Sequence, residues 1–138
     1  MSTRLKEKEE KLLRILERLA EESAKGTPII VEGKKDIEAL RALSVNGKII
    51  SAKTGGKHLI DVVSELENTS ALEVILLLDF DRRGKELTRK LQHFLERTGI
   101  RVNVAFWLEL SAMVGNEVKD IEGLASYMET LKSKISNS

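Results

Sequence analysis

The stretch VILLLDFDRRGKEL, residues 74–87, decides the fold. A run of branched apolar residues ends in two aspartates, which are followed by two arginines, a glycine and a lysine. Near-continuous apolar strands are typical of parallel sheets that are covered by helices on both faces. In open sheets of this kind, ligands bind beyond the carboxyl ends of the strands. We therefore interpret Asp79 and Asp81 as candidate site residues at a strand end.

Strands and helices alternate on both sides of this stretch. The pattern of apolar residues predicts short strands at residues 27–33, 47–57, 72–81 and 100–108. It predicts helices at residues 34–45, 58–69, 84–99 and 116–135, the last of which is one helix or a pair. This alternation indicates an α/β fold with a four-stranded, mainly parallel sheet and helices on both faces.

Residues 2–26 are predicted to form a long amphipathic helix that ends at Gly26. Leu5, Leu12 and Leu19 recur every seven residues. We expect this helix to pack as an arm on its own domain, because a stable coiled coil needs more repeats than these. A homodimer formed through the same leucines is the alternative.

Composition restricts the class of protein. Of the 138 residues, 41% are hydrophobic and 33% are charged, as expected of a folded globular chain in the cytoplasm. No cysteine is present, which excludes disulfide and thiolate chemistry, and the N-terminus lacks the apolar region of a secretory signal. The 23 basic and 22 acidic residues give a net charge of +1, so contact with nucleic acid must depend on a local basic cluster.

Three acidic residues stand at predicted strand ends: Glu32 after the first strand, and Asp79 and Asp81 after the third. If the strand order is 2-1-3-4, the first and third strands are neighbours and the three carboxylates converge. Crowded carboxylates repel one another, and a hard divalent cation removes that repulsion. We therefore predict a Mg²⁺ site, which Mn²⁺ can also fill. In the alternative, the aspartates are turn residues, one of which caps the next helix.

Basic residues surround the same strand ends. Lys34, Lys35, Arg82, Arg83 and Lys85 lie within a few positions of them, and Lys57 follows the glycine pair at the end of the second strand. Cations and helix N-termini both bind phosphate, so these residues are candidate phosphate or nucleic-acid ligands. The alternative for each is a solvated surface charge. Thr54, Gly55 and Gly56 either approach a ligand or form a simple turn, and His58 either contacts a phosphate or is incidental at the start of a helix.

The segments IIVEGKKDIEAL and ILLLDFDRRGKEL, separated by a unit that ends in AKTGGK, resemble the Toprim domain of topoisomerases, primases, nucleases and RNA maturases. The resemblance covers residues 27–125, between the arm at 1–26 and a helical end at 126–138. It implies a Rossmann-like fold and a Mg²⁺-dependent site for cleavage, joining or nucleotidyl transfer. Glu32 matches the family's general acid or base and is also a candidate metal ligand, and Asp79 and Asp81 match its metal-binding pair. Gly33 and Gly84 match the glycines that follow these motifs.

Further acids are similar to those of the RNA-maturase branch. Asp36 follows Glu32 in the form E-G-x-x-D, and Asp120 and Glu122 lie in VKDIEGL. The alternative for Asp36 is a carboxylate in the first turn of a helix, and for the other two a place on a helix surface. Trp107, which we place at the end of the fourth strand with Phe106, is expected in the core, with base stacking as the alternative.

Three functions are compatible with these residues. The first is a Mg²⁺-dependent nuclease or RNA maturase acting on RNA or DNA. The second is a noncatalytic Toprim module that binds nucleic acid or a partner protein within a complex. The third is a phosphatase in which Asp79 is the nucleophile. The third is less favoured, because Asp81 is followed by Arg82, Arg83 and Gly84 and Glu32 would have no role.

Overall fold

The computed structural model describes residues 3–53 and 56–137, and Thr54 and Gly55 lie outside the described residues. Its sheet consists of β1 (Ile29–Val31), β2 (Ile49–Ser51), β3 (Glu73–Leu76) and β4 (Arg101–Asn103). All neighbouring strands are parallel and their order is β2-β1-β3-β4. The α/β fold and the strand order are therefore as predicted. Because β1 and β3 are neighbours, Glu32 and Asp79 leave the sheet at the same edge.

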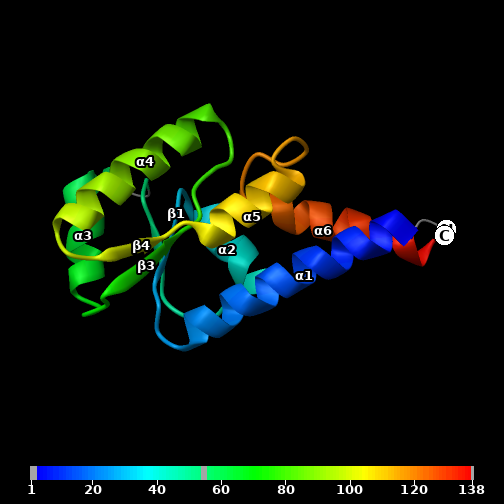
Figure 1. Ribbon diagram of the computed structural model, residues 1–138, viewed down its shortest axis with the longest axis horizontal. Helices are drawn as coiled ribbons and strands as arrows, with labels where there is room; N and C mark the ends of the chain where they lie inside the picture. Colours follow the sequence, from blue (N-terminus) through cyan, green and yellow to red (C-terminus); the bar gives the residue numbers. More distant parts are fainter. Residues whose placement is uncertain (1–2, 54–55, 138) are drawn as a thin grey trace.

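Helices cover both faces of this sheet (Figure 1). One face packs against α3 (Leu59–Glu67) and α4 (Arg82–Arg97), with Ile30, Leu76 and Leu78 pointing toward them. The other face packs against α1 (Thr3–Ala24), α2 (Lys34–Ala42), α5 (Ala105–Val114) and α6 (Ile121–Ser136). Successive strand residues point to opposite faces, and both faces are buried. This explains why the stretch from Val74 to Leu78 is apolar throughout.

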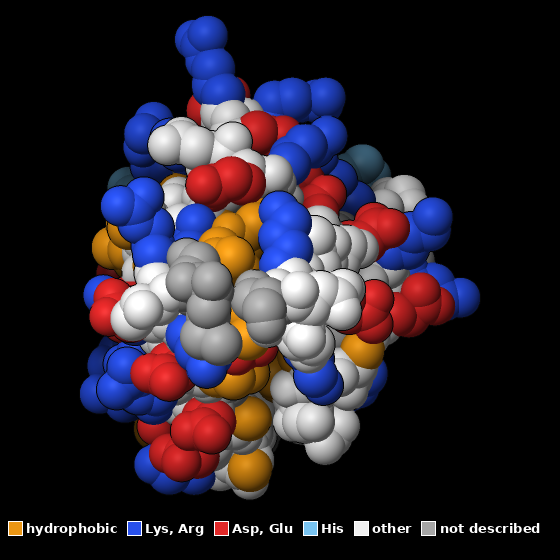
Figure 2. All heavy atoms as spheres, turned by 90° about the vertical axis from the view of Figure 1, so that its right-hand side faces the viewer, with side chains coloured by type: hydrophobic (Ala, Val, Ile, Leu, Met, Phe, Trp, Pro, Cys, Tyr) orange, Lys and Arg blue, Asp and Glu red, His pale blue; other side chains and the backbone are white. Residues whose placement is uncertain are grey.

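The N-terminal helix α1 packs on its own chain. Leu12, Ile15, Leu16 and Leu19 are buried against α5 and α6. The start of α1 and the end of α6 lie side by side (Figure 1). At that end of the molecule, basic and acidic side chains are intermixed around small hydrophobic areas (Figure 2). No helix in the described part of the chain combines the length and apolar character that a membrane crossing requires.

The predicted extent of the fourth strand is wrong. β4 ends at Asn103, and residues 105–114 form the helix α5 instead. The side-chain oxygen of Asn103 accepts a hydrogen bond of 2.9 Å from the N–H of Ala105, at the start of the helix. Phe106, Trp107 and Leu110 are buried on α5 at helical spacing. A short apolar run such as this cannot be assigned to strand or helix from periodicity alone.

Candidate metal centre

Glu32 and Asp79 meet at the carboxyl edge of the sheet. The backbone N–H of Asp79 donates a hydrogen bond of 3.2 Å to Oε1 of Glu32. The other oxygen of Glu32, Oε2, forms an ion pair of 3.1 Å with Nζ of Lys53. Glu32 is buried, with 8% of its surface exposed. Its carboxylate is therefore fixed beside Asp79, as the predicted strand order requires.

Three aspartates from separate parts of the chain lie around one point. Asp36 in the first turn of α2, Asp79 after β3 and Asp120 before α6 each offer a carboxylate oxygen, and these oxygens lie within 4.8 Å of one another. Asp36 is buried and accepts backbone hydrogen bonds from Gly33 and from Glu122. Asp120 caps α6 by accepting a hydrogen bond of 2.7 Å from Gly123. We call Asp36, Asp79 and Asp120 the aspartate cluster.

Asp79 is the member of the cluster whose pKa is shifted most strongly. Burial, followed by the negative charges of Glu32, Asp36 and Asp120, raises the pKa of Asp79 to about 7. Burial also raises the pKa of Asp36, although the N–H groups of Glu122 and Gly33 oppose that rise. A hydrogen bond between the carboxyl groups of Asp79 and Glu32 also contributes to the raised pKa of Asp79. Its negative charge is thus crowded by other acids.

Asp81 lies apart from the aspartate cluster. Its side chain caps α4 by accepting a hydrogen bond of 2.8 Å from the N–H of Gly84. Gly84 is itself packed against Asp79, since a Cβ atom at this position would lie 2.0 Å from the Asp79 carbonyl oxygen. Only glycine allows α4 to begin so close to the end of β3. The second aspartate of the motif thus serves the helix-capping role considered for it above.

The basic residues predicted at the starts of α2 and α4 are all exposed. Lys34 and Lys35 are exposed in the first turn of α2, and Arg83 and Lys85 are exposed in the first turn of α4. Arg82 is also exposed and forms a 3.6 Å ion pair with Glu86.

The side chain of Lys57 is bound by neighbouring groups of the chain. Its Nζ donates to the carbonyl oxygen of Ser51 and forms a 2.7 Å ion pair with Glu65. His58 is an exposed residue at the start of α3, with its backbone N–H bonded to Asp61. These two residues are therefore engaged in local structure around α3.

The donor set of the aspartate cluster suits a hard divalent cation. All three ligand atoms are carboxylate oxygens, which Mg²⁺ and Mn²⁺ prefer over softer donors. Burial and then the charges of neighbouring acids oppose a negative charge on Asp79 and raise its pKa, and a bound cation would favour that charge. The residues present therefore fit the metal that the sequence predicts.

Sequence reasoning missed Lys53 and, for Trp107, the contact with Leu78. Lys53 pairs with Glu32 because β2 lies beside β1, so that the residues after Ser51 run beside Glu32. Trp107 donates a hydrogen bond of 2.9 Å from Nε1 to the carbonyl oxygen of Leu78, immediately before Asp79. The strand order predicts that Lys53 lies beside Glu32. The contact of Trp107 could be predicted only if residues 105–114 were recognised as a helix.

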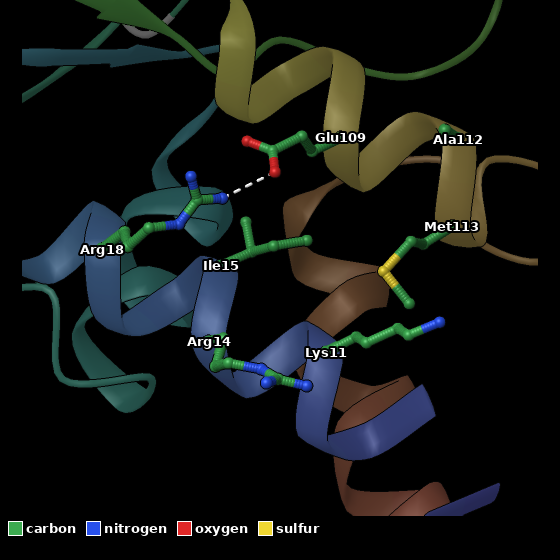
Figure 3. Close-up of a pocket in the computed structure, with 7 residues that line it drawn as sticks. All are labelled: Lys11, Arg14, Ile15, Arg18, Glu109, Ala112 and Met113. Atoms are coloured by element: carbon green, nitrogen blue, oxygen red, sulfur yellow. Dashed lines mark hydrogen bonds and ion pairs between the residues drawn. The ribbon is translucent and has the colours of Figure 1, made fainter. Parts of the chain in front are cut away.

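Several hollows border α5, and two of them differ in the helix that faces it. One, of about 450 Å³, lies between α1 and α5 and is lined by Lys11, Arg14, Arg18 and Glu109 among others (Figure 3). Arg18 crosses from α1 to Glu109 of α5 in a 2.6 Å ion pair, drawn as a dashed line in Figure 3. The other, of about 300 Å³, lies between α4 and α5. The residues of the aspartate cluster line neither of them.

Comparison with known proteins gives consistent matches. The family model of the Toprim domain matches residues 27–107. A UPF0292 protein of Methanocaldococcus jannaschii is 42% identical over 120 residues, covering 86% of this chain and 91% of that protein. A UPF0292 protein of Methanosarcina acetivorans is 36% identical, covering 91% and 85%. A solved structure of a protein from Aquifex aeolicus is similar with a TM-score of 0.68 and 31% identity, covering 79% of this chain and 94% of that one. The matched domain includes Asp36 and Asp79 but ends before Asp120.

Proposed function

The chain belongs to the Toprim domain family, and from this premise we propose that it is a divalent-cation-dependent enzyme that cleaves the phosphodiester backbone of RNA or DNA. A Toprim domain indicates a metal-dependent role connected with nucleic acid. The observation that carries the proposal is the aspartate cluster, whose oxygens lie within 4.8 Å of one another. It stands at the edge of the sheet where parallel α/β folds bind their ligands.

Asp36, Asp79 and Asp120 would hold the cation. When bound, a divalent cation polarises a phosphoryl oxygen and neutralises the charge that develops on it. Glu32 is the proposed general acid or base, since its carboxylate is fixed against the backbone of Asp79. The exposed cations Lys34, Lys35, Arg83 and Lys85 would hold the phosphates.

The test is metal binding together with cleavage. Asp79→Asn removes one ligand charge with little change of shape, and we expect it to abolish Mg²⁺-dependent cleavage of labelled RNA and DNA. It should also weaken Mn²⁺ binding, measured by calorimetry, by about tenfold or more. Glu96→Gln is the matched control, because Glu96 is an exposed acid near the far end of α4. Cleavage that survives in Asp79→Asn would refute the proposed site.

A noncatalytic binding module is the second candidate, and one observation favours it. Both oxygens of Glu32 are engaged, one by the Asp79 N–H and the other by Lys53. A carboxylate held in this way can fix the position of the loop after β3. This structural role explains both contacts of Glu32 without any proton transfer. Nucleic-acid binding that requires Mg²⁺ but is followed by no cleavage, with either RNA or DNA, would identify this second function.

A further inference from the structure

The hollow between α4 and α5, here the α4–α5 pocket, combines unpaired cations with an apolar wall. Its volume is about 300 Å³, at the lower end of the range for small-molecule sites. α4 contributes polar side chains, and α5 with the residue before it contributes apolar ones. The residues used below are Lys85, Arg89, Gln92, Val104, Trp107 and Leu108.

The cationic side consists of Lys85 and Arg89. They are four residues apart and therefore neighbours on the surface of α4. Both are exposed, and neither is ion-paired with any acid in the described part of the chain. Two like charges at this spacing destabilise a helix slightly. An anionic ligand would remove that repulsion, and phosphate suits both an ammonium and a guanidinium group.

The apolar side combines the exposed Leu108 with the buried ring of Trp107. Leu108 is 55% exposed, so its side chain is available for contact with a ligand. Trp107 is 8% exposed, and its ring is fixed by the hydrogen bond from Nε1 to the Leu78 carbonyl. A nucleobase can pack against such an apolar wall, and the half-buried Gln92 amide can both donate to and accept from a base edge.

The pocket adjoins the aspartate cluster through the chain itself. Trp107 bonds to the residue that immediately precedes Asp79. Lys85 lies in the first turn of α4, and its backbone N–H donates to the carbonyl oxygen of Asp81. These two hydrogen bonds connect the pocket to the segment that carries Asp79 and Asp81.

We propose that the α4–α5 pocket binds one nucleotide of a single-stranded nucleic acid. Its phosphate contacts Lys85 and Arg89, and its base packs on Val104, Trp107 and Leu108. This rests on the proposed function only in taking nucleic acid as the ligand. Binding here requires no metal, so the pocket and the aspartate cluster can be tested separately.

Trp107 is the sole tryptophan of the chain, so its fluorescence reports on the pocket directly. We would titrate the protein in EDTA with short oligo(dT) and, separately, oligo(rU). Saturable quenching or a spectral shift is expected with at least one of them, and the tighter of the two assigns DNA or RNA as the ligand. Absence of any change with both would overturn the proposal.

Substitutions in the α4–α5 pocket test whether the oligonucleotide binds there. Lys85→Gln and Arg89→Gln should each weaken binding about tenfold at low salt. Leu108→Ser should weaken it without a change of charge. Two control variants remove one positive charge away from the pocket. They are Arg14→Gln, in the hollow between α1 and α5, and Arg97→Gln, in the last turn of α4.

Equal losses in these controls and in Arg89→Gln would show diffuse attraction and refute the pocket. Asp79→Asn should bind the oligonucleotide in EDTA at least as well as the unaltered protein, since it removes a nearby negative charge. That variant distinguishes the two proposals: failure of the metal site leaves the fluorescence response intact, and failure of the pocket leaves Mn²⁺ binding intact.

Discussion

The backbone N–H of Asp79 donates a hydrogen bond to Oε1 of Glu32, although the two residues are 47 positions apart in the chain. The parallel pairing of β1 with β3 brings them together. Lys53 binds the other oxygen of Glu32, so this acid is paired with a cation from the segment that follows β2. Asp79 is surrounded by further acids instead. Glu32 is therefore paired with a cation, whereas Asp79 lies among other acids.

We predict that the metal-free protein loses stability as the pH rises from about 4 to about 7. Burial, and then the charges of Glu32, Asp36 and Asp120, raise the pKa of Asp79 from 3.8 to about 7. Between these two values the folded state binds more protons than the unfolded state, so the free energy of unfolding falls with increasing pH. The contribution is fully present below pH 3.8 and is lost as the pH passes 7.

The variant Asp79→Asn carries no titrating group at this position and should show a weaker pH dependence. Melting temperatures measured by circular dichroism in EDTA, from pH 5 to pH 8, check this. Asp79→Asn should be more stable than the unaltered protein at pH 8, and the difference should shrink toward pH 5. Glu96→Gln serves as the control for loss of one acid. An advantage of Asp79→Asn that grows toward low pH would contradict the assigned surroundings of Asp79.

Gly84→Ala should destabilise the fold by about 2 kcal/mol or more. Its Cβ atom would lie 2.0 Å from the carbonyl oxygen of Asp79, and a backbone atom cannot move away as a flexible side chain can. Gly33→Ala is the matched control, because the nearest atom to its Cβ would be 3.8 Å away. Urea unfolding measures both, with a loss below about 1 kcal/mol expected for the control. Equal losses would mean that close packing at residue 84 is not the cause.

Much of the fold could be predicted because its strands carry strong local signals. The five apolar residues from Val74 to Leu78 indicate a strand buried on both faces, and that requires a parallel sheet between helices. Such a sheet places residues 32 and 79 at one edge. The meeting of Glu32 with Asp79 therefore followed from elementary rules of strand pairing.

The composition of the aspartate cluster was harder to predict. Asp81 and Asp120 both precede helices and both cap them, so local sequence does not distinguish their roles. What separates them is the packing of α2 against α6, which brings Asp120 to Asp36 across 84 residues of chain. Contacts between helices depend on tertiary packing, which no local pattern encodes. The helix α5 was mistaken for a continuation of β4 for a different reason, because a short apolar run does not distinguish a strand from a helix.

Leu12→Ala should cost about 2–5 kcal/mol of stability, if α1 belongs to the folding core. Leu12 is fully buried against other helices. Its neighbour Leu13 is 44% exposed, so Leu13→Ala should cost less than about 1 kcal/mol. Urea unfolding of the two variants provides the comparison. If Leu12→Ala leaves the main unfolding transition unchanged, then α1 is a separable arm.

Asp120→Asn should weaken Mn²⁺ binding by about tenfold or more, and Asp81→Asn should change it by less than about threefold. Both aspartates are helix N-caps, and asparagine caps as well as aspartate, so each helix should keep its start. Each substitution removes one negative charge from the same edge of the sheet. The difference that remains is that Asp120 shares the 4.8 Å cluster with Asp36 and Asp79.

Calorimetric titration with Mn²⁺ measures both affinities, and circular dichroism verifies that the melting temperatures are similar. Asp36→Asn is expected to resemble Asp120→Asn in metal affinity. It should also lose stability, because Asp36 is buried and bonded to the N–H groups of Gly33 and Glu122. If Asp81→Asn instead abolishes binding while Asp120→Asn retains it, then the ion is held by the two aspartates of the sequence motif. The helix cap of α4 would then have to open when the metal binds.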